Sequence, residues 1–386
     1  MTGSIKERVR EHLESLAQGA VEISHQVHSH AEVGFEEFRS SALLKSEFEK
    51  EGFEVESGSA GLPTAFVAKK GSGELQVGFC LEYDALPGIG HACGHNIIAS
   101  SSYLAAAALA PFTQDLGISI RALGTPSEEG GGGKILMLEA GSFTGLNLAM
   151  MIHPGPAELD RMNTIAAKHI DIHFEGKPAH ASAFAFLGIN AQDAMVISQV
   201  ALGLARQQLL PYEKVHGIVT QGGDAANIIP ARVDANYIIR SDTLAHLSVL
   251  EPKIMRCFEA GALATGAKLT YSSPAPPYAE LRTNEDLAGF YVQNATSLGR
   301  VFAKDDSGLT ASTDMGNISL EVASIHPVIS IDSLPAVNHQ PEFTQAATTD
   351  VADKAVIEGA LAMAWTVCDA ATDGSVRKRL LAQSCR

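Results

Sequence analysis

The sequence has few cysteines, no excess of basic residues and no long hydrophobic run. Its five cysteines, Cys80, Cys93, Cys257, Cys368 and Cys385, are odd in number and scattered over 386 residues. A disulfide framework is therefore not expected, and a reducing cytoplasm is the expected compartment. No run of about 18 apolar residues occurs, which argues against a transmembrane span. The start, MTGSIKERVREHLESL, reads as a charged helix and not as a secretory signal.

The charge balance excludes another group of functions. The formal net charge is −16, whereas nucleic acids and anionic membranes are bound by basic surfaces. We therefore expect neither as a partner, while a small-molecule substrate remains open. Apolar residues make up 46% and charged residues 19% of the chain, which is typical of a globular protein. The length favours two domains.

The first part of the chain alternates between strand and helix patterns. Strands are expected at 75–81, 117–124 and 146–152, and helices at 5–30, 36–51, 96–112 and 133–141. Asn96 is a plausible N-cap and Gly141 a plausible end for the last two helices. Such alternation predicts a mostly parallel sheet covered by helices.

The pattern changes in the middle of the chain. Residues 167–176 alternate like a half-exposed strand, and further strands and two helices follow up to about 274. This indicates an inserted α+β unit with an antiparallel sheet and two helices. PAPPYAEL, at 274–281, reads as a boundary, after which the α/β style resumes. We therefore predict a discontinuous domain of residues 1–164 and 278–386, with residues 165–277 inserted.

Polar side chains follow successive strands of the expected parallel sheet. Sites in such sheets form outside the carboxyl ends of the strands, so these side chains should share one edge. His339, in AVNHQPEF, follows another predicted strand and could join them. The others are Asp84, Cys93, His95, Glu128, Glu129 and His153.

Thiolate, imidazole and carboxylate together suit zinc, or manganese, cobalt or nickel, better than magnesium or calcium. Each residue alone has a plainer interpretation, since a lone buried histidine usually belongs to the core and a lone Glu-Glu pair to a solvated face. Their gathering at successive strand ends favours a metal site. One glutamate of the pair Glu128–Glu129 could then bind metal while the other serves as general base.

Other polar motifs carry less information. EEGGGGK does not fit the phosphate-loop pattern, because Glu128 stands where the first glycine belongs and Ile135 follows the lysine. Its glycines more plausibly let the backbone pass close to the site. In the inserted unit, His180, Asn227 and Arg240 could be functional or structural.

Seven motifs together resemble a known family. They are HAEVGFEEF, EYDALPGIGHACGHN, GTPSEEGGGGK, GKPAHAS, NIIPARVDANYIIR, STDMGNIS and NHQPEF. Their order, over residues 28–350, is similar to that in the aminoacylase/carboxypeptidase/acetylornithine-deacetylase-type metallopeptidases. Within these, the chain is most similar to the amidohydrolase subset, notably aminobenzoyl-glutamate hydrolase subunits and β-alanyl-dipeptidase-like proteins.

The resemblance implies a catalytic domain with a dimerisation lid, a homodimer, and two divalent transition-metal ions per subunit. Carried over by motif, Cys93 would bridge the ions, and His95, Glu129, His153 and His339 would complete the ligands. Glu128 would be the general base and acid. Asp84 would contact a metal ligand without binding the metal itself. His180 would reach the active site of a partner subunit and polarise the scissile carbonyl. Asn227 and Arg240 would hold the carboxylate or acyl end of the substrate.

The implied activity is hydrolysis of the amide bond of an N-acyl amino acid or dipeptide-like substrate, aminobenzoyl-glutamate-like or β-alanyl-dipeptide-like. An aminoacylase or auxin-conjugate-like hydrolase of the same fold is the nearest alternative. Two other classes stay open: a thiol hydrolase with Cys93 as nucleophile, and an inactive binding protein. The chain departs from many relatives at Asn96, where aspartate is common, so we exclude that residue as a ligand.

Overall fold

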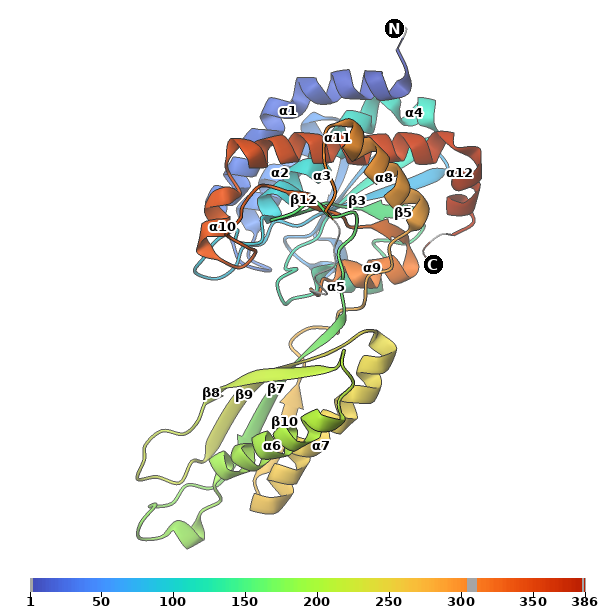
Figure 1. The fold of residues 1–386 in the computed structure, drawn as a ribbon. Helices are drawn as coiled ribbons and strands as arrows, with labels where there is room; N and C mark the ends of the chain where they lie inside the picture. The colour runs from blue at the N-terminus through green and yellow to red at the C-terminus, as the bar shows by residue number, and fades with distance from the viewer. Residues whose placement is uncertain (1–2, 304–310, 384, 386) are drawn as a thin grey trace. The chain divides into compact units, whose positions relative to one another are not determined.

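The computed structural model describes residues 3–303, 311–383 and 385. It divides into two compact units, whose helices and strands are labelled in Figure 1. One is formed by Met1–Asn163 and Leu281–Arg386, and the other by Thr164–Glu280. Each unit has its own hydrophobic core, so the two are described separately.

The first unit is built on a six-stranded sheet in the order β1-β2-β4-β3-β5-β11. The strands are β1 Glu54–Ser57, β2 Phe66–Gly71, β3 Leu75–Leu81, β4 Ile118–Gly124, β5 Leu148–Met150 and β11 Ala323–Ile325. β4, β3, β5 and β11 run parallel, and β2 and β1 extend the sheet in antiparallel fashion. The predicted mostly parallel sheet is confirmed, although its two antiparallel strands and β11 were not foreseen.

Helices cover both faces of this sheet (Figure 1). One face packs against α1 Ile5–His30, α2 Phe38–Lys50, α3 His95–Leu109, α8 Glu285–Ser297 and α11 Asp350–Thr372. The other packs against α5 Gly133–Glu139 and α9 Met315–Glu321. α4 Thr113–Leu116, α10 Pro341–Ala346 and α12 Gly374–Leu381 complete the unit.

The pleat of β3 explains this layering, because alternate residues of a strand point to opposite faces. Val77 and Phe79 enter the core under α1, α3 and α11, while Cys80 enters the smaller core under α5 and α9. Both faces of the strand are therefore apolar, and its sequence reads as a continuous hydrophobic run.

The two segments that contain Ile-His-Pro lie side by side. β5 pairs with β11. β6 His153–Gly155, which begins within the first Ile-His-Pro, pairs with β12 Val328–Ser330, which follows the second, in a separate two-stranded sheet. The expected strand at 146–152 is therefore shorter than predicted. The predicted strand that precedes His339 corresponds to β12, which does not belong to the main sheet.

The second unit is an antiparallel sheet of order β10-β7-β9-β8. Its strands are β7 Ala166–Glu175, β8 Lys214–Gln221, β9 Arg232–Ser241 and β10 Lys268–Ser272, and its helices are α6 Ala191–Ala205 and α7 Leu244–Thr265. Along β7, Ile170, Ile172 and Phe174 are buried in the core of this unit. The predicted α+β unit is confirmed.

The expected capping role of Asn96 is wrong. The N-cap of α3 is Gly94, in the left-handed region at φ 76°. Asn96 lies inside the first turn, fully buried, and its amide donates to Ser24 Oγ and to the Ala347 carbonyl, both at 2.9 Å. The side chain therefore fastens α3 to α1 and to the segment before α11.

Within the described residues, α11 alone is long and apolar enough to cross a membrane by length and composition. Its most apolar window is 78% buried inside the structure. It packs against α1, α3 and α8, as the central helix of a globular core does.

Candidate metal centre

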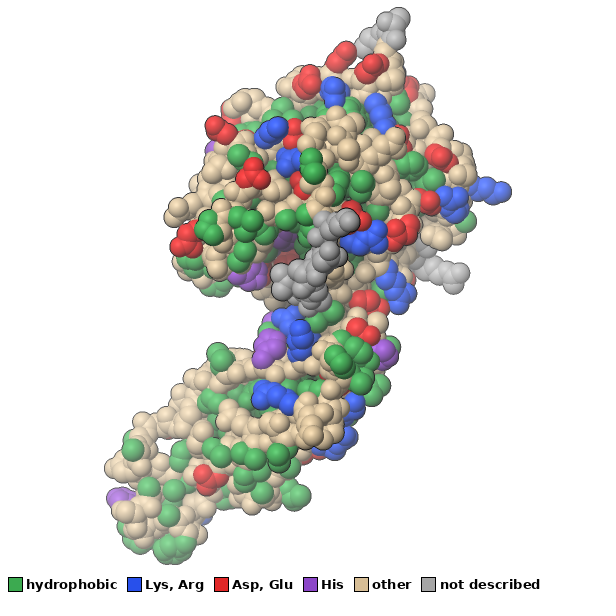
Figure 2. Space-filling model, viewed as in Figure 1, with side chains coloured by type: hydrophobic (Ala, Val, Ile, Leu, Met, Phe, Trp, Pro, Cys, Tyr) green, Lys and Arg blue, Asp and Glu red, His purple; other side chains and the backbone are tan. Residues whose placement is uncertain are grey.

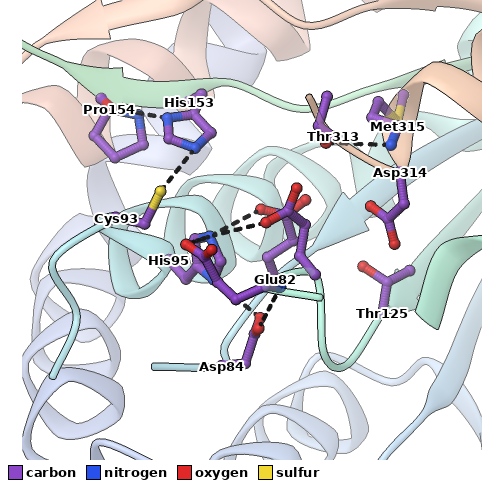
Figure 3. Close-up of polar contacts among 12 residues, drawn as sticks. Glu82, Asp84, Cys93, His95, Thr125, His153, Pro154, Thr313, Asp314 and Met315 are labelled. Carbon is purple, nitrogen blue, oxygen red and sulfur yellow. Dashed lines mark hydrogen bonds and ion pairs between the residues drawn. The ribbon is translucent and has the colours of Figure 1, made fainter. Parts of the chain in front are cut away.

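The carboxyl ends of the parallel strands deliver the site residues, as the strand-end rule predicts. Asp84 follows β3, Glu128 and Glu129 follow β4, and His153 follows β5. Cys93 lies in the segment that joins β3 to α3, and His95 is the first residue of α3. Figure 3 shows the side chains of Asp84, Cys93, His95 and His153 gathered in one region.

Gly94 makes the Cys-Gly-His element possible. Its φ of 76° is one that other residues rarely adopt, and a Cβ there would lie 2.4 Å from Cγ of Pro154. Any larger residue would push the loop away from His153. Cys93 and His95 can therefore face the same point from either side of this glycine.

The nitrogens of His95 have contrasting surroundings. Nδ1 lies 2.9 Å from Asp84 Oδ1, whereas Nε2 is buried without a hydrogen-bond partner. Burial acts to raise the pKa of Asp84, but His95 outweighs it and lowers that pKa to about 2. Asp84 also accepts from the Glu129 backbone N–H at 3.0 Å. A carboxylate on one ring nitrogen, with the other nitrogen available to an ion, is the usual setting of a metal-binding histidine.

His153 is arranged in the same way. Its Nδ1 donates to the Pro154 carbonyl at 2.8 Å, and its Nε2 lies 3.5 Å from Cys93 Sγ (Figure 3). A thiolate and an imidazole on one tetrahedral zinc ion, with bonds of about 2.3 and 2.0–2.1 Å, would stand roughly 3.5 Å apart. The pair is therefore spaced as two ligands of one ion would be.

The Glu128–Glu129 segment is held by a buried network. Ser127, at φ 56°, donates its backbone N–H to Glu37 Oε1 at 2.8 Å. A Cβ on Gly133 would lie 1.8 Å from the Pro126 carbonyl, so only glycine fits at this turn of the segment. Burial, then the charge of Glu82, raises the pKa of Glu128 well above its ordinary value.

His339 reaches the cluster from the segment before α10. Its backbone N–H donates to the Ala92 carbonyl at 2.8 Å, which ties it to the Cys93 loop. Its Nε2 lies 3.2 Å from Glu129 Oε1. Asn338 next to it donates to the Pro154 carbonyl at 3.2 Å. His339 therefore joins the other residues, although at least 186 positions separate it from each of them in the sequence.

The ligand atoms form two groups that share one sulfur. Cys93, His95 and His153 offer atoms within 4.8 Å of one another, and so do Cys93, Glu129 and His339. Sulfur, nitrogen and oxygen donors that gather around one shared thiol fit a two-metal centre.

Four buried residues of this region were not singled out from the sequence. Glu82 lies two positions before Asp84 and therefore on the same side of an extended chain. Lys134 stands in EEGGGGK and Asp314 in STDMGNIS. His326 sits in SIHP, which repeats the MIHP of His153, and neither of its ring nitrogens has a hydrogen-bond partner. The repeated Ile-His-Pro was the available signal for His326.

The three residues expected in the inserted unit lie at opposite ends of its sheet. His180 pairs with Ile228, and the Ala181 N–H donates to the Asn227 carbonyl at 2.9 Å, so His180 and Asn227 are neighbours. Arg240 lies near the far end of β9, opposite Ala167. From Arg232 to Arg240 the strand spans roughly 27 Å at about 3.4 Å per residue. The unit therefore does not bring Arg240 together with the other two.

Comparison with known proteins agrees with this fold and site. The family model for the peptidase dimerisation domain of the M20 type matches residues 166–265. The Xaa-Arg dipeptidase of Mus musculus is 37% identical over 383 residues, covering 95% of this chain and 88% of that protein. A p-aminobenzoyl-glutamate hydrolase subunit of Escherichia coli (strain K12) is 28% identical, covering 81% and 71%.

Solved structures share the fold. An aminobenzoyl-glutamate utilization protein from Klebsiella pneumoniae superposes with a TM-score of 0.77 at 17% identity, covering 95% of this chain and all of that one. A dinuclear metal-binding peptidase of the M20 family from Bacillus subtilis gives 0.65 at 20% identity, covering 90% and 98%.

Fold and comparisons together define a hydrolase of amide bonds. The chain belongs to the M20 family of metallopeptidases and amidohydrolases. It is a metal-dependent amidohydrolase that acts on acyl amino acids or dipeptides. The resemblance found in the sequence motifs is confirmed.

Proposed function

We propose that the unit of residues 1–163 and 281–386 holds two divalent transition-metal ions bridged by Cys93. His95 and His153 would bind one ion, and Glu129 and His339 the other. The observation that supports this assignment is the pair of ligand groups that share Cys93 Sγ. The mixture of sulfur, nitrogen and oxygen donors favours zinc or manganese, with cobalt or nickel as possible substitutes.

When bound, the ions would polarise the scissile carbonyl and make a water nucleophilic near neutral pH. Glu128 acts as general base, takes the proton of the attacking water and returns it to the leaving amine. A carboxylate whose pKa is raised by burial suits both steps, because it holds the proton between them. Asp84 fixes the ring of His95 and the backbone of Glu129.

The inserted unit would complete the site from a second copy of the chain. We assign His180 to the polarisation of the substrate carbonyl in the active site of a partner subunit, with Asn227 beside it. Arg240 would bind a substrate carboxylate. The distance along β9 supports this division, since one inserted unit cannot bring both ends of its sheet to one small substrate.

An apolar stripe on α6 supports dimer formation through the inserted unit. Val196, Val200 and Leu204, one helical turn apart, are 47%, 59% and 72% exposed. Figure 2 shows hydrophobic side chains gathered on this unit. β8 is an edge strand of the described sheet, and its Ile218 is 65% exposed. Exposed apolar surface of this kind marks protein interfaces, and the matched family model is named for dimerisation.

The substrate proposed is a dipeptide or N-acyl amino acid with a free carboxylate. Xaa-Arg dipeptides lead the candidates, because the Mus musculus relative that covers nearly the whole chain is an Xaa-Arg dipeptidase. β-Alanyl dipeptides, p-aminobenzoyl-glutamate and simple N-acyl amino acids follow. We keep the cytoplasm as the expected compartment, in line with the free thiols of Cys80, Cys93, Cys257 and Cys368.

The test combines elemental analysis of the purified protein with hydrolysis of this substrate panel before and after chelation. One to two transition-metal ions per chain, with chelator-sensitive release of a free amino acid, would support the proposal. A metal-free protein whose activity survives chelation would overturn it.

That second outcome would reopen the thiol mechanism with Cys93 as nucleophile. Its surroundings oppose that mechanism, since burial and then the charge of Glu129 raise the pKa of the Cys93 thiol. A nucleophilic cysteine requires the opposite shift.

A further inference from the structure

The carboxylate of Glu82, directly after β3, has two oxygens in different surroundings. Oε1 accepts a hydrogen bond from Lys134 Nζ. Oε2 has no hydrogen-bond partner and lies 3.4 Å from His95 Nε2, which has none either. Both side chains are fully buried. Burying two neighbouring polar atoms without hydrogen-bond partners costs free energy. This indicates that a further group belongs between them.

Lys134 and Asp314 hold Glu82 in this orientation. The Lys134 ammonium contacts Glu82 and also Asp314 Oδ1, at 2.8 Å. The backbone N–H of Lys134 donates to the other Asp314 oxygen at 2.9 Å. Lys134 lies in the first turn of α5 and Asp314 is the residue before α9. The ammonium is therefore held between Asp314 and Glu82, and it fixes one oxygen of Glu82 while the other faces His95.

Stability alone does not account for this network. A buried ion-pair network is often no more stabilising than apolar residues of the same volume, because all of its charges must be desolvated. Lys134 is already paired with Asp314 through two hydrogen bonds, one of them from its backbone. Glu82 adds a further negative charge to a region already crowded with carboxylates.

We propose that Glu82 is an additional ligand of the metal centre, and that Lys134 and Asp314 are positioning residues that hold it there. This inference rests on the metal centre of the proposed function. Oε2 of Glu82, Nε2 of His95 and an oxygen of Glu128 can lie within 4.8 Å of one another. Oxygen and nitrogen ligands on one tetrahedral ion, with bonds of about 2.0–2.2 Å, stand roughly 3.4 Å apart. The observed Glu82–His95 separation is 3.4 Å.

The test measures metal binding directly. Wild type and the variants Glu82→Gln, Lys134→Met and Asp314→Asn are stripped of metal and titrated with Zn²⁺ against a chromophoric chelator. Bound zinc is then counted by elemental analysis after dialysis. Glu158→Gln is the matched control, because Glu158 is a buried glutamate of the same unit that pairs with Arg300. Circular dichroism of the stripped proteins checks that each variant is folded.

We expect Glu82→Gln to lower the affinity of one zinc site by about 10–100-fold, or to reduce the bound zinc by one ion. The range is that seen when groups around a metal are removed. Lys134→Met and Asp314→Asn should weaken the same site, and Glu158→Gln should bind like wild type. If Glu82→Gln does not fold, Glu82→Asp replaces it, because its shortened carboxylate should weaken the same site.

Two zinc ions bound by a folded Glu82 variant with wild-type affinity would overturn the inference and leave Glu82 as a counter-charge for Lys134. A wild-type protein that binds no zinc, manganese or cobalt would instead overturn the proposed function itself. The two failures are therefore distinguishable in one titration series.

Discussion

Replacement of Glu128 by glutamine separates catalysis from stability. The residue is 8% exposed, so the amide occupies a buried position of nearly the same shape. General base catalysis contributes about 10²–10⁴-fold to rate, or roughly 3–5 kcal/mol of barrier at 1.36 kcal/mol per tenfold. We therefore expect kcat to fall by about that factor while the bound metal stays unchanged.

Without metal, the Glu128→Gln protein should be at least as stable as the wild type. The folded protein raises the pKa of Glu128, through burial and then the charges of Glu82 and Glu129. An acid with a raised folded pKa contributes stability at low pH and loses that contribution as the pH rises through the folded value. Glutamine never ionises, so the variant should unfold at no lower a temperature than wild type, with its advantage largest at high pH.

The assay is steady-state hydrolysis of the best panel substrate, with metal content and the melting temperature measured on the same preparation. Glu129→Gln is the matched control, since loss of a proposed ligand should remove metal together with activity. A Glu128→Gln protein that retains full metal and near-normal turnover would refute the base assignment. Lost activity accompanied by lost metal would show that Glu128 is a ligand and not the base.

Four further outcomes are expected. Chelation should lower the melting temperature by roughly 10 °C, because metal at about 1,000 times Kd contributes about 4 kcal/mol per site; an unchanged melting curve would argue against tight sites. Burial and then the charge of Asp84 raise the pKa of Glu37 to about 7, so between about pH 4.5 and 7 stability should fall as pH rises, by up to roughly 3 kcal/mol. Glu37→Gln should flatten that slope in pH-dependent thermal melts, and an unaltered slope would place the effect elsewhere. Leu204→Glu, on the exposed stripe of α6, should convert a dimer to monomer in sedimentation velocity without lowering the melting temperature, whereas a retained dimer would move the interface to another surface. His180→Ala should lower kcat more than it raises KM, and when mixed with the Glu128→Gln protein it should recover activity, because mixed dimers rebuild one intact site; no recovery would place His180 in the site of its own subunit.

Local patterns in the sequence determine much of this protein. Alternating strand and helix segments predict the layered first unit because a parallel sheet needs helical crossovers. The strand-end rule gathers Cys93, His95, Glu128 and His153 because parallel strands end at one edge. These inferences depend on short-range periodicity and chain direction, and both can be read directly from the sequence. The seven motifs resemble those of the metallopeptidase family and so also identify the family from the sequence.

Only the tertiary structure decided which atoms face one another. Nothing in the spacing pairs Lys134 with Asp314, since 180 positions separate them, nor does it show that Asn96 holds two helices together. The left-handed backbone at Gly94 and the placement of His339 against Ala92 are likewise set by packing between distant segments. The sequence alone thus supplied the kinds of ligand and the sheet edge that carries them. The buried charged residues next to those ligands, such as Lys134 and Asp314, depend on long-range contacts. A charged residue is buried only where the fold places a partner of opposite charge beside it.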